Sequence, residues 1–312
     1  MGFSLSRRLN YDTRMLSYLH AFHAGNSADV LKHSALVFCL EYLKKKEKPL
    51  LCVDTHAGAG FYDLSGTNAP ANREWEKGLG LLPQNTAELP AMLANYVKRV
   101  TADKTNPARY PGSPAIMAKM LAAGDRLVCF ELHPRQAQLL KTALAEIREK
   151  AARSSPAIEA RCEDGLRGLK SLLPPPSRRG LVLVDPPWEE KSEYETVPCA
   201  VQSALKRFPQ GTFIIWYPLL AIPKTAAAAP VRETLFDLSG GNRCRLELYT
   251  HSPESPPPTA ESGTENQNSP RNMYGCGLVI YNPPWTLRPA LEETLPYLAG
   301  VFGKNGGWNL TI

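Results

Sequence analysis

The sequence contains no long hydrophobic segment and no closely paired cysteines. No apolar run reaches the roughly 18 residues that a membrane-spanning helix requires, so we expect no membrane association. The seven cysteines are scattered without a Cys-x-x-Cys pair, which argues against a disulfide framework and favours a reducing compartment. No spacing of Cys and His matches a zinc site, so we also expect no bound metal.

The charge balance is mildly basic. Over 312 residues, 36 Lys and Arg against 30 Asp and Glu give a formal net charge of +6 and a pI of about 8.9. A basic excess suits a polyanionic partner such as nucleic acid but does not require one. The contents of 43% hydrophobic and 21% charged residues are typical of a globular domain rather than a disordered chain.

Short β-branched or apolar runs alternate with helical patterns along most of the chain. This alternation predicts an α/β fold with a parallel sheet covered on both faces. No helical pattern separates the last two runs, so we expect them to pair antiparallel. The prediction is therefore five parallel strands followed by a terminal antiparallel hairpin. The seven expected strands are Pro49–Val53, Arg126–Phe130, Ile158–Cys162, Leu181–Val184, Thr212–Tyr217, Arg243–Tyr249 and Gly277–Tyr281.

Three segments depart from this alternation. Residues 1–14 hold three arginines without periodicity, and we expect a disordered leader before one large domain at 15–312. Residues 61–111 exceed a simple crossover between strands and include a helix with one apolar face, which predicts an inserted helical subdomain. Residues 252–270 are rich in Ser and Pro and poor in apolar residues, which predicts a flexible loop.

Acidic residues or glycines follow each of the first four expected strands. Ligands of open α/β sheets bind beyond these carboxyl ends. The segment Asp54–Gly60 supplies two glycines that let backbone amides approach a ligand, although the full Gly-x-Gly-x-x-Gly fingerprint is absent. Glu131 suits a ribose diol, and the Asp164-Gly165 pair suits an adenine amine. Each acid alone is more often a helix cap or a surface charge, but together they indicate a nucleotide-like ligand.

The tetrapeptide Asp185-Pro186-Pro187-Trp188 follows the fourth strand and carries the most specific signal. Its prolines fix the backbone and remove two amide donors, which leaves an acceptor-rich rim. A planar substrate could donate its amino group to Asp185 and to the carbonyl of Pro186, while stacking on Trp188. A second copy, Asn282-Pro283-Pro284-Trp285, follows the last strand. Strand order favours the first copy, because the fourth strand neighbours the glycine loop of the first in a doubly wound sheet.

These features resemble the amino-methyltransferases that use S-adenosylmethionine. Several longer segments are similar to the RlmJ-type 23S ribosomal RNA adenine-N6 methyltransferases. The resemblance extends from Met15 nearly to the end of the chain. It departs at the leader, at the 252–270 loop and at Trp188, where tyrosine is usual in the family. The segments that carry it are Met15–His33, Asp54–Gly60, Tyr110–Pro114, Glu131–Pro134, Ser177–Leu181 and Asn282–Trp285.

The resemblance implies a Rossmann-like class I methyltransferase sheet, S-adenosylmethionine as methyl donor, no metal, and a cytoplasmic enzyme acting on 23S ribosomal RNA. No obligate protein partner is evident. Asp185 matches the catalytic proton acceptor of the family and is expected to border the donor as well. Tyr18 and His20 match a segment implicated in the target adenine and its RNA. The positions that match the family's donor pocket are His33, His56, Ser113, Glu131, Asp164 and Gly165.

Basic residues offer candidate contacts to the RNA backbone. These are Lys32, the run Lys44–Lys46 with Lys48, and the pair Arg178-Arg179, although a solvated helix end explains the lysine run equally well. Two alternative functions remain at this point. A DNA adenine-N6 methyltransferase would have the same Asp-Pro-Pro-aromatic rim. A non-catalytic RNA-binding module with a methyltransferase-like fold is disfavoured by the intact Asp185 and glycine loop.

Overall fold

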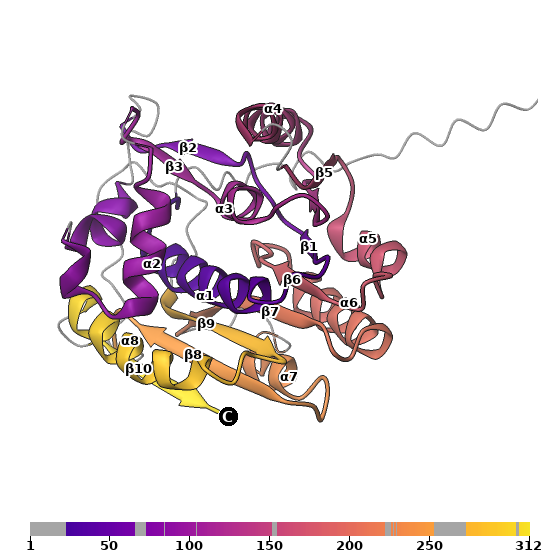
Figure 1. Cartoon of the computed structure of the whole chain (residues 1–312). Coiled ribbons are helices and arrows are strands. Elements are labelled where there is room, and N and C mark those ends of the chain that lie inside the picture. The colour runs from indigo at the N-terminus through magenta and orange to yellow at the C-terminus, as the bar shows by residue number, and fades with distance from the viewer. Residues whose placement is uncertain are drawn as a thin grey trace, which may run out of the picture.

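The computed structural model describes residues 23–65, 73–83, 85–103, 105–151, 155–221, 226, 228, 230–252, 273–303 and 306–312. The helices and strands alternate along the chain, as Figure 1 shows. The helices are α1 Ser27–Lys44, α2 Ala91–Val100, α3 Ser113–Met120, α4 Pro134–Ala151, α5 Gly165–Leu172, α6 Glu193–Arg207, α7 Val231–Phe236 and α8 Leu287–Phe302. The strands are β1 Leu51–Asp54, β2 Phe61–Asp63, β3 Arg109–Pro111, β4 Arg126–Phe130, β5 Ala157–Arg161, β6 Gly180–Val184, β7 Thr212–Leu220, β8 Arg243–Tyr249, β9 Met273–Tyr281 and β10 Gly307–Thr311.

The central sheet has the order β10-β8-β9-β7-β6-β1-β4-β5. Strands β5, β4, β1, β6 and β7 are parallel, and β9 pairs antiparallel with both β7 and β8. The predicted five parallel strands and terminal antiparallel hairpin are therefore confirmed. The prediction missed β10, which pairs antiparallel with β8 at the edge of the sheet.

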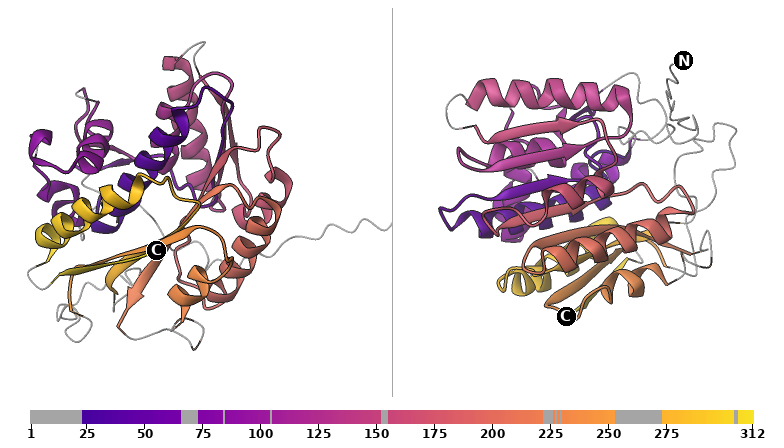
Figure 2. Two further views of the ribbon diagram at one scale, coloured as in Figure 1. Left: turned by 60° about the horizontal axis from the view of Figure 1, so that its bottom comes forward. Right: turned by 90° about the vertical axis from the view of Figure 1, so that its right-hand side faces the viewer.

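Two hydrophobic clusters lie on opposite faces of this sheet, because successive side chains of a strand point to opposite faces. In β1, Cys52 joins the cluster formed with α1, α2, α3, α4 and α8. Its neighbours Leu51 and Val53 join the second cluster, with α5, α6 and α7. The result is a three-layer arrangement of helices, sheet and helices (Figure 2).

We expected an inserted helical subdomain at 61–111. The described residues of this segment form one α-helix, three short 3₁₀ turns and the small β2–β3 sheet. The 3₁₀ turns are Glu74–Lys77, Leu79–Leu81 and Thr86–Glu88. The buried face of α2 belongs to the same hydrophobic cluster as α1 and the sheet. The segment also packs closely against the start of α1, since a Cβ at Gly78 would lie 2.2 Å from the carbonyl oxygen of Gly25.

Two of the predicted segments lie outside the described residues. These are the leader at 1–14 and, apart from Ser252, the loop at 252–270. Tyr18 and His20 also lie outside them. In the part of the chain that is described, no helix is both long and apolar enough to cross a membrane.

Candidate active site

A cavity of about 300 Å³ lies at the carboxyl ends of β1, β4, β5 and β6. Its position is the one expected of ligand sites in open α/β sheets. The predicted residues His56, Glu131, Asp164, Gly165 and Asp185 all line it. The other lining residues are Thr55, Gly58, Leu132, His133, Gln136, Glu163, Leu166, Pro187, Glu189, Glu190, Ser192, Glu193 and Thr196.

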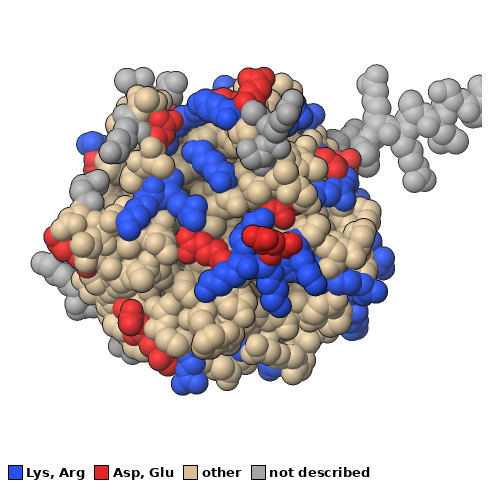
Figure 3. All heavy atoms as spheres, viewed as in Figure 1, with Lys and Arg blue, Asp and Glu red and all other residues tan. Residues whose placement is uncertain are grey.

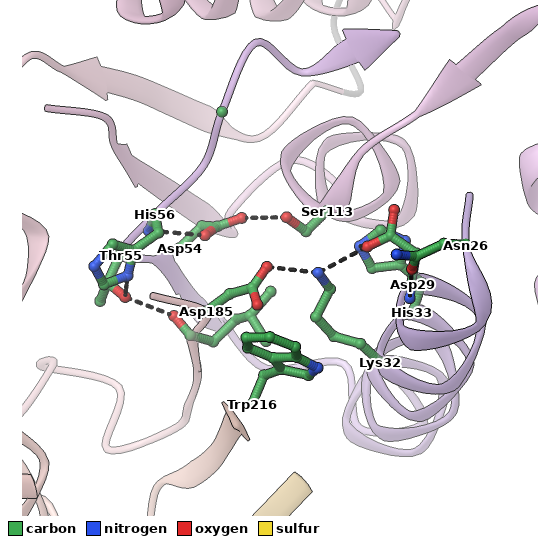
Figure 4. A network of polar contacts seen from close by, with 12 residues as sticks. Asn26, Asp29, Lys32, His33, Asp54, Thr55, His56, Ser113, Asp185 and Trp216 are labelled. Carbon is green, nitrogen blue, oxygen red and sulfur yellow. Dashed lines mark hydrogen bonds and ion pairs between the residues drawn. The ribbon is translucent and has the colours of Figure 1, made fainter. Parts of the chain in front are cut away.

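The end of β1 is fixed by a buried carboxyl group. Asp54 is fully buried, and its Oδ2 accepts a hydrogen bond of 2.7 Å from the hydroxyl of Ser113 at the start of α3. Its Oδ1 accepts one of 3.3 Å from the backbone N–H of His56. The pKa of Asp54 is raised to about 7, mainly by burial and in part by the charge of Asp185, against the opposing hydrogen bond from the Ser113 hydroxyl. Ser113 therefore reaches the site through Asp54 and does not itself line the cavity (Figure 4).

Glu131 joins the loop after β1 to the loop after β4. Its Oε2 accepts a hydrogen bond of 2.8 Å from the backbone N–H of Gly58, and its Oε1 accepts one of 2.7 Å from the backbone N–H of His133. These bonds orient the carboxylate at the cavity wall. Because an ionised carboxylate has about four acceptor positions, Glu131 can still accept from hydroxyl groups of a ligand.

Asp164 and Gly165 place the start of α5 against the loop after β1. Asp164 caps the helix, with its carboxylate accepting from the backbone N–H of Arg167 at 3.2 Å. A Cβ at Gly165 would lie 2.2 Å from the carbonyl oxygen of Thr55, so no larger residue fits without movement of the backbone. Glycine is thus required here by the close approach of two backbone segments.

Asp185 is held by a lysine from α1. The Nζ of Lys32 lies 2.5 Å from Oδ2 of Asp185 and 2.8 Å from Oδ1 of Asp29 (Figure 4). Burial alone would lower the pKa of Lys32, but the charges and hydrogen bonds of Asp185 and Asp29 outweigh burial and raise it. The lysine is therefore a permanent cation beside Asp185. Among the described residues, Oδ1 of Asp185 has no hydrogen-bond partner.

The structure corrects the role expected for Lys32 and repositions His33. Lys32 was expected to contact the RNA backbone, but it is only 3% exposed because both of its carboxylate partners are buried or nearly so. His33 is 1% exposed and does not line the cavity. Its Nδ1 lies 2.8 Å from the hydroxyl of Tyr110, on the side of α1 that packs against the core. In this arrangement His33 is not placed to contact a methyl donor in the cavity directly.

The expected stacking role of Trp188 is also corrected. Its side chain is 1% exposed and belongs to the hydrophobic cluster of α5, α6 and α7. The indole N–H donates to the carbonyl oxygen of Trp216 at 3.0 Å, and the ring contacts that of Tyr194 with centroids 5.0 Å apart. The residue takes a φ of +54°. The turn therefore points the indole into the core, away from any incoming base.

Comparison with known proteins agrees with this geometry. Residues 47–229 match the family described as ribosomal RNA large subunit methyltransferase D, RlmJ. The chain is 36% identical over 301 residues to ribosomal RNA large subunit methyltransferase J of Haemophilus influenzae, covering 96% of this chain and 98% of that protein. It is 37% identical over 301 residues to the protein of the same name from Escherichia coli, with the same coverage.

The chain belongs to the RlmJ family. The resemblance inferred from the sequence segments is confirmed, and the protein is a methyltransferase. The fold agrees as well: a crystal structure of a Legionella pneumophila protein matches with a TM-score of 0.76 and 30% identity, covering 93% of this chain and 98% of that one. Membership in an enzyme family leaves no support for the non-catalytic alternative.

The walls of the cavity of this RlmJ-family protein are strongly acidic. No Lys or Arg is among its described lining residues, while seven acids are, namely Glu131, Glu163, Asp164, Asp185, Glu189, Glu190 and Glu193. Burial raises the pKa of Glu193 to about 7, opposed by two backbone hydrogen bonds. Burial also lowers the pKa of His56 to about 4, so its imidazole is neutral near pH 7. The cavity therefore suits a cationic ligand.

The acids do not form a metal centre in the part of the chain that is described. No group of three or more His, Cys, Asp or Glu side chains there is arranged to hold a metal ion. The expectation of a metal-independent reaction stays a prediction.

Most of the other basic residues considered for RNA contact lie at the amino ends of the parallel strands, opposite the cavity. The backbone N–H of Leu51, at the amino end of β1, donates to the carbonyl oxygen of Arg179. The guanidinium of Arg179 binds the carbonyl oxygens of Lys48 and Leu43, and Lys44 pairs with Asp125, which precedes β4. Arg179 and Lys44 therefore hold neighbouring segments of the chain together, and these amino ends of the strands are remote from Asp185.

Sequence reasoning missed Asp29 and Asp54. Asp29 lies three residues before Lys32 on α1, so the two side chains share one face of the helix. That spacing could have indicated the ion pair. The link from Lys32 to Asp185 joins residues 153 positions apart, and no local pattern reports it.

Proposed function

We propose that this protein transfers a methyl group from S-adenosylmethionine to the exocyclic N6 of an adenine in 23S ribosomal RNA. The observation that carries the proposal is the position of Asp185, which lines the acidic cavity on one side and is paired with Lys32 on the other. The similarity of the chain to named large-subunit methyltransferases supports the RNA substrate. A ribosomal RNA substrate also implies the cytoplasm.

The cavity fits the methyl donor in size and in charge. A volume of about 300 Å³ is at the lower end of the range typical of cofactor sites, roughly 300–1,000 Å³. S-adenosylmethionine carries a sulfonium and an ammonium group, and the acidic walls complement both. We assign Glu131 to the ribose hydroxyls and Asp164 to the adenine amine. When bound, the donor supplies an electrophilic methyl group.

Asp185 and the carbonyl of Pro186 are proposed to accept the two N–H bonds of the target amine. This amine is a poor nucleophile because its lone pair is delocalised into the ring. Acceptors on both N–H bonds favour pyramidal geometry and localise the lone pair. The charge of Lys32 fixes one oxygen of Asp185, so the other is oriented for the substrate. As the bond between the nitrogen and the methyl carbon forms, the bond from that carbon to the sulfonium sulfur breaks and leaves a neutral thioether, and Asp185 accepts the proton released from the nitrogen. Holding the amine in line with the methyl group can lower the activation barrier by roughly 7–11 kcal/mol.

The target base must leave its stack to reach Asp185, because a paired base presents no accessible amine to a cavity. Since Trp188 is buried, stacking of the base falls to other groups. Tyr18 and His20 keep the substrate role that the family resemblance implies. They precede α1, the helix that carries Lys32.

A radiolabelled-methyl assay with matched substrates tests the proposal. The purified protein is incubated with labelled S-adenosylmethionine and unmodified 23S ribosomal RNA, 16S ribosomal RNA or DNA of the 23S sequence. We expect label only in 23S RNA, as N6-methyladenosine after digestion to nucleosides. Equal or preferential labelling of the DNA would support the DNA methyltransferase alternative instead. Label in another nucleoside would contradict the assignment of the reacting nitrogen.

A further inference from the structure

A second groove of about 340 Å³ lies on α1, α2 and α3, away from the candidate active site. Its apolar walls are Ala102, Pro111, Ile116 and Met120. Its polar rim consists of Glu41, Asn95, Lys98, Arg99 and Lys119. The groove thus combines an apolar floor with three cations. In contrast, no Lys or Arg is among the described residues that line the candidate active site.

The single acid of the groove is already engaged. Glu41 accepts hydrogen bonds from Asn95 at 3.0 Å and from Arg99 at 2.8 and 3.3 Å. These bonds hold the Arg99 guanidinium beside Glu41. Lys98 and Lys119 are exposed. The rim therefore carries three cations against one acid and has a net positive charge.

Charges of both signs lie near Lys119. Partial burial lowers the pKa of its ammonium group, the charge of Asp103 opposes this, and the charges of Arg109 and Lys150 lower the pKa further. Glu146 pairs with both of these cations. A bound anion would favour the charged form of Lys119. Figure 3 shows Lys and Arg side chains gathered over α2, α3 and the end of α1 on the face turned to the viewer.

The groove and Asp185 lie toward opposite ends of the same two helices. On α1, Lys32 contacts Asp185 and Glu41 lines the groove, nine residues or roughly 13 Å further along. On α3, Ser113 bonds Asp54 at the site, while Lys119 and Met120 at the other end line the groove. A ligand that reached both would have to extend well beyond one nucleotide.

We propose that this groove binds the sugar–phosphate backbone of ribosomal RNA at a point remote from the target adenine. Phosphates would contact Lys98, Arg99 and Lys119, and the ribose would lie on the apolar floor. No aromatic side chain is among the described lining residues, which disfavours a stacked base and favours the backbone. The inference rests on the proposed RNA substrate, because only a long polyanion would use both places.

The salt dependence of RNA binding tests the groove. The double variant Lys98→Gln, Lys119→Gln is compared with the parent in titrations of in vitro transcribed 23S ribosomal RNA across a range of KCl concentrations. Each lost phosphate contact lowers the slope of log K against log salt by about 0.7–0.9. We therefore expect a slope smaller by about 1.4–1.8, and binding weaker by roughly tenfold or more at 0.1 M salt.

The matched control is Lys141→Gln, which removes an exposed lysine on α4 outside the groove. It should leave the slope unchanged. Melting temperature and donor affinity, measured by calorimetry, should be unchanged in all variants. If the double variant bound RNA with the same salt slope and the same affinity as the parent, the proposal that this groove binds RNA would be overturned. If the parent itself neither binds nor methylates 23S RNA, the proposed function fails instead.

Discussion

The two Pro-Pro-Trp tetrapeptides have nearly the same sequence but lie at opposite ends of the parallel strands. Asp185 follows the carboxyl end of β6 and lines the cavity. Asn282 follows β9, which is antiparallel to β7, so it lies beside Thr212 at the amino end of β7. The direction of the preceding strand therefore decides whether the motif reaches the site.

Their side chains differ in the same way. Asn282 donates to the carbonyl oxygens of Pro209 and Gly211 at 2.8 and 2.7 Å, and its φ of +50° is one that asparagine tolerates. These two hydrogen bonds hold the turn after β9 against the segment that precedes β7. Asp185 instead pairs with Lys32. Trp188 is 1% exposed and Trp285 is 77% exposed. A short motif thus specifies a turn, and its surroundings specify what the turn does.

The largest expected contrast concerns the first residue of each tetrapeptide. Asp185→Ala removes the proposed acceptor, so methyl transfer to RNA should fall by about 100- to 10,000-fold. Asn282→Ala removes two hydrogen bonds to backbone carbonyls remote from the cavity, which should cost about 1–3 kcal/mol of stability and leave turnover nearly unchanged. A radiolabelled-methyl assay with melting curves measures both effects.

The control for this contrast is Asp185→Asn, which keeps the volume of the side chain while removing its charge. It should be nearly as inactive as Asp185→Ala and should still bind the donor in calorimetry. An active Asp185→Asn variant, or an inactive but stable Asn282→Ala variant, would contradict the assignment of the catalytic copy.

The next contrast concerns the two tryptophans. Trp188→Ala would leave a cavity in the core and should lower the free energy of unfolding by about 3–5 kcal/mol. Trp285→Ala removes a largely exposed ring and should change it by less than about 0.5 kcal/mol. Chemical denaturation of both variants measures the difference. Should Trp188→Ala retain parental stability and lose only RNA methylation, the indole would be a substrate contact after all.

The smallest expected contrast concerns titration near the first tetrapeptide. Asp54 has a folded-state pKa of about 7, above its value of 3.8 without these neighbours. Between pH 4 and 7 the folded state therefore holds a proton that the unfolded state has released, so this carboxyl reduces stability as the pH rises. Asp54→Asn cannot titrate. Its stability relative to the parent should increase from pH 4 to pH 7 and then level off.

The measurement is chemical denaturation of parent and Asp54→Asn at several pH values. His56, whose lowered pKa makes stability rise between about pH 4 and 6.5, is present in both proteins and cancels in the difference. A stability difference that stays flat across this range would show that Asp54 does not titrate there.

The positions and directions of the central strands could be predicted from the sequence, because apolar runs and the helical patterns between them are local features. The strand β10 could not, since its position depends on pairing with β8, more than 50 residues earlier. In the site, the acids and the glycine expected after successive strands line one cavity, and their roles as donor ligands stay predictions. Lys32 and Trp188 were assigned wrongly because the partners that bury them come from distant elements.

The most direct test of the central claim is analysis of ribosomal RNA from cells that lack this protein. Nucleosides of the purified 23S RNA are measured by mass spectrometry in the deletion strain and in the strain complemented with the parent or with Asp185→Ala. The account predicts that one N6-methyladenosine disappears on deletion, returns with the parent and does not return with Asp185→Ala. An unchanged N6-methyladenosine content in the deletion strain, or full restoration by Asp185→Ala, would contradict it.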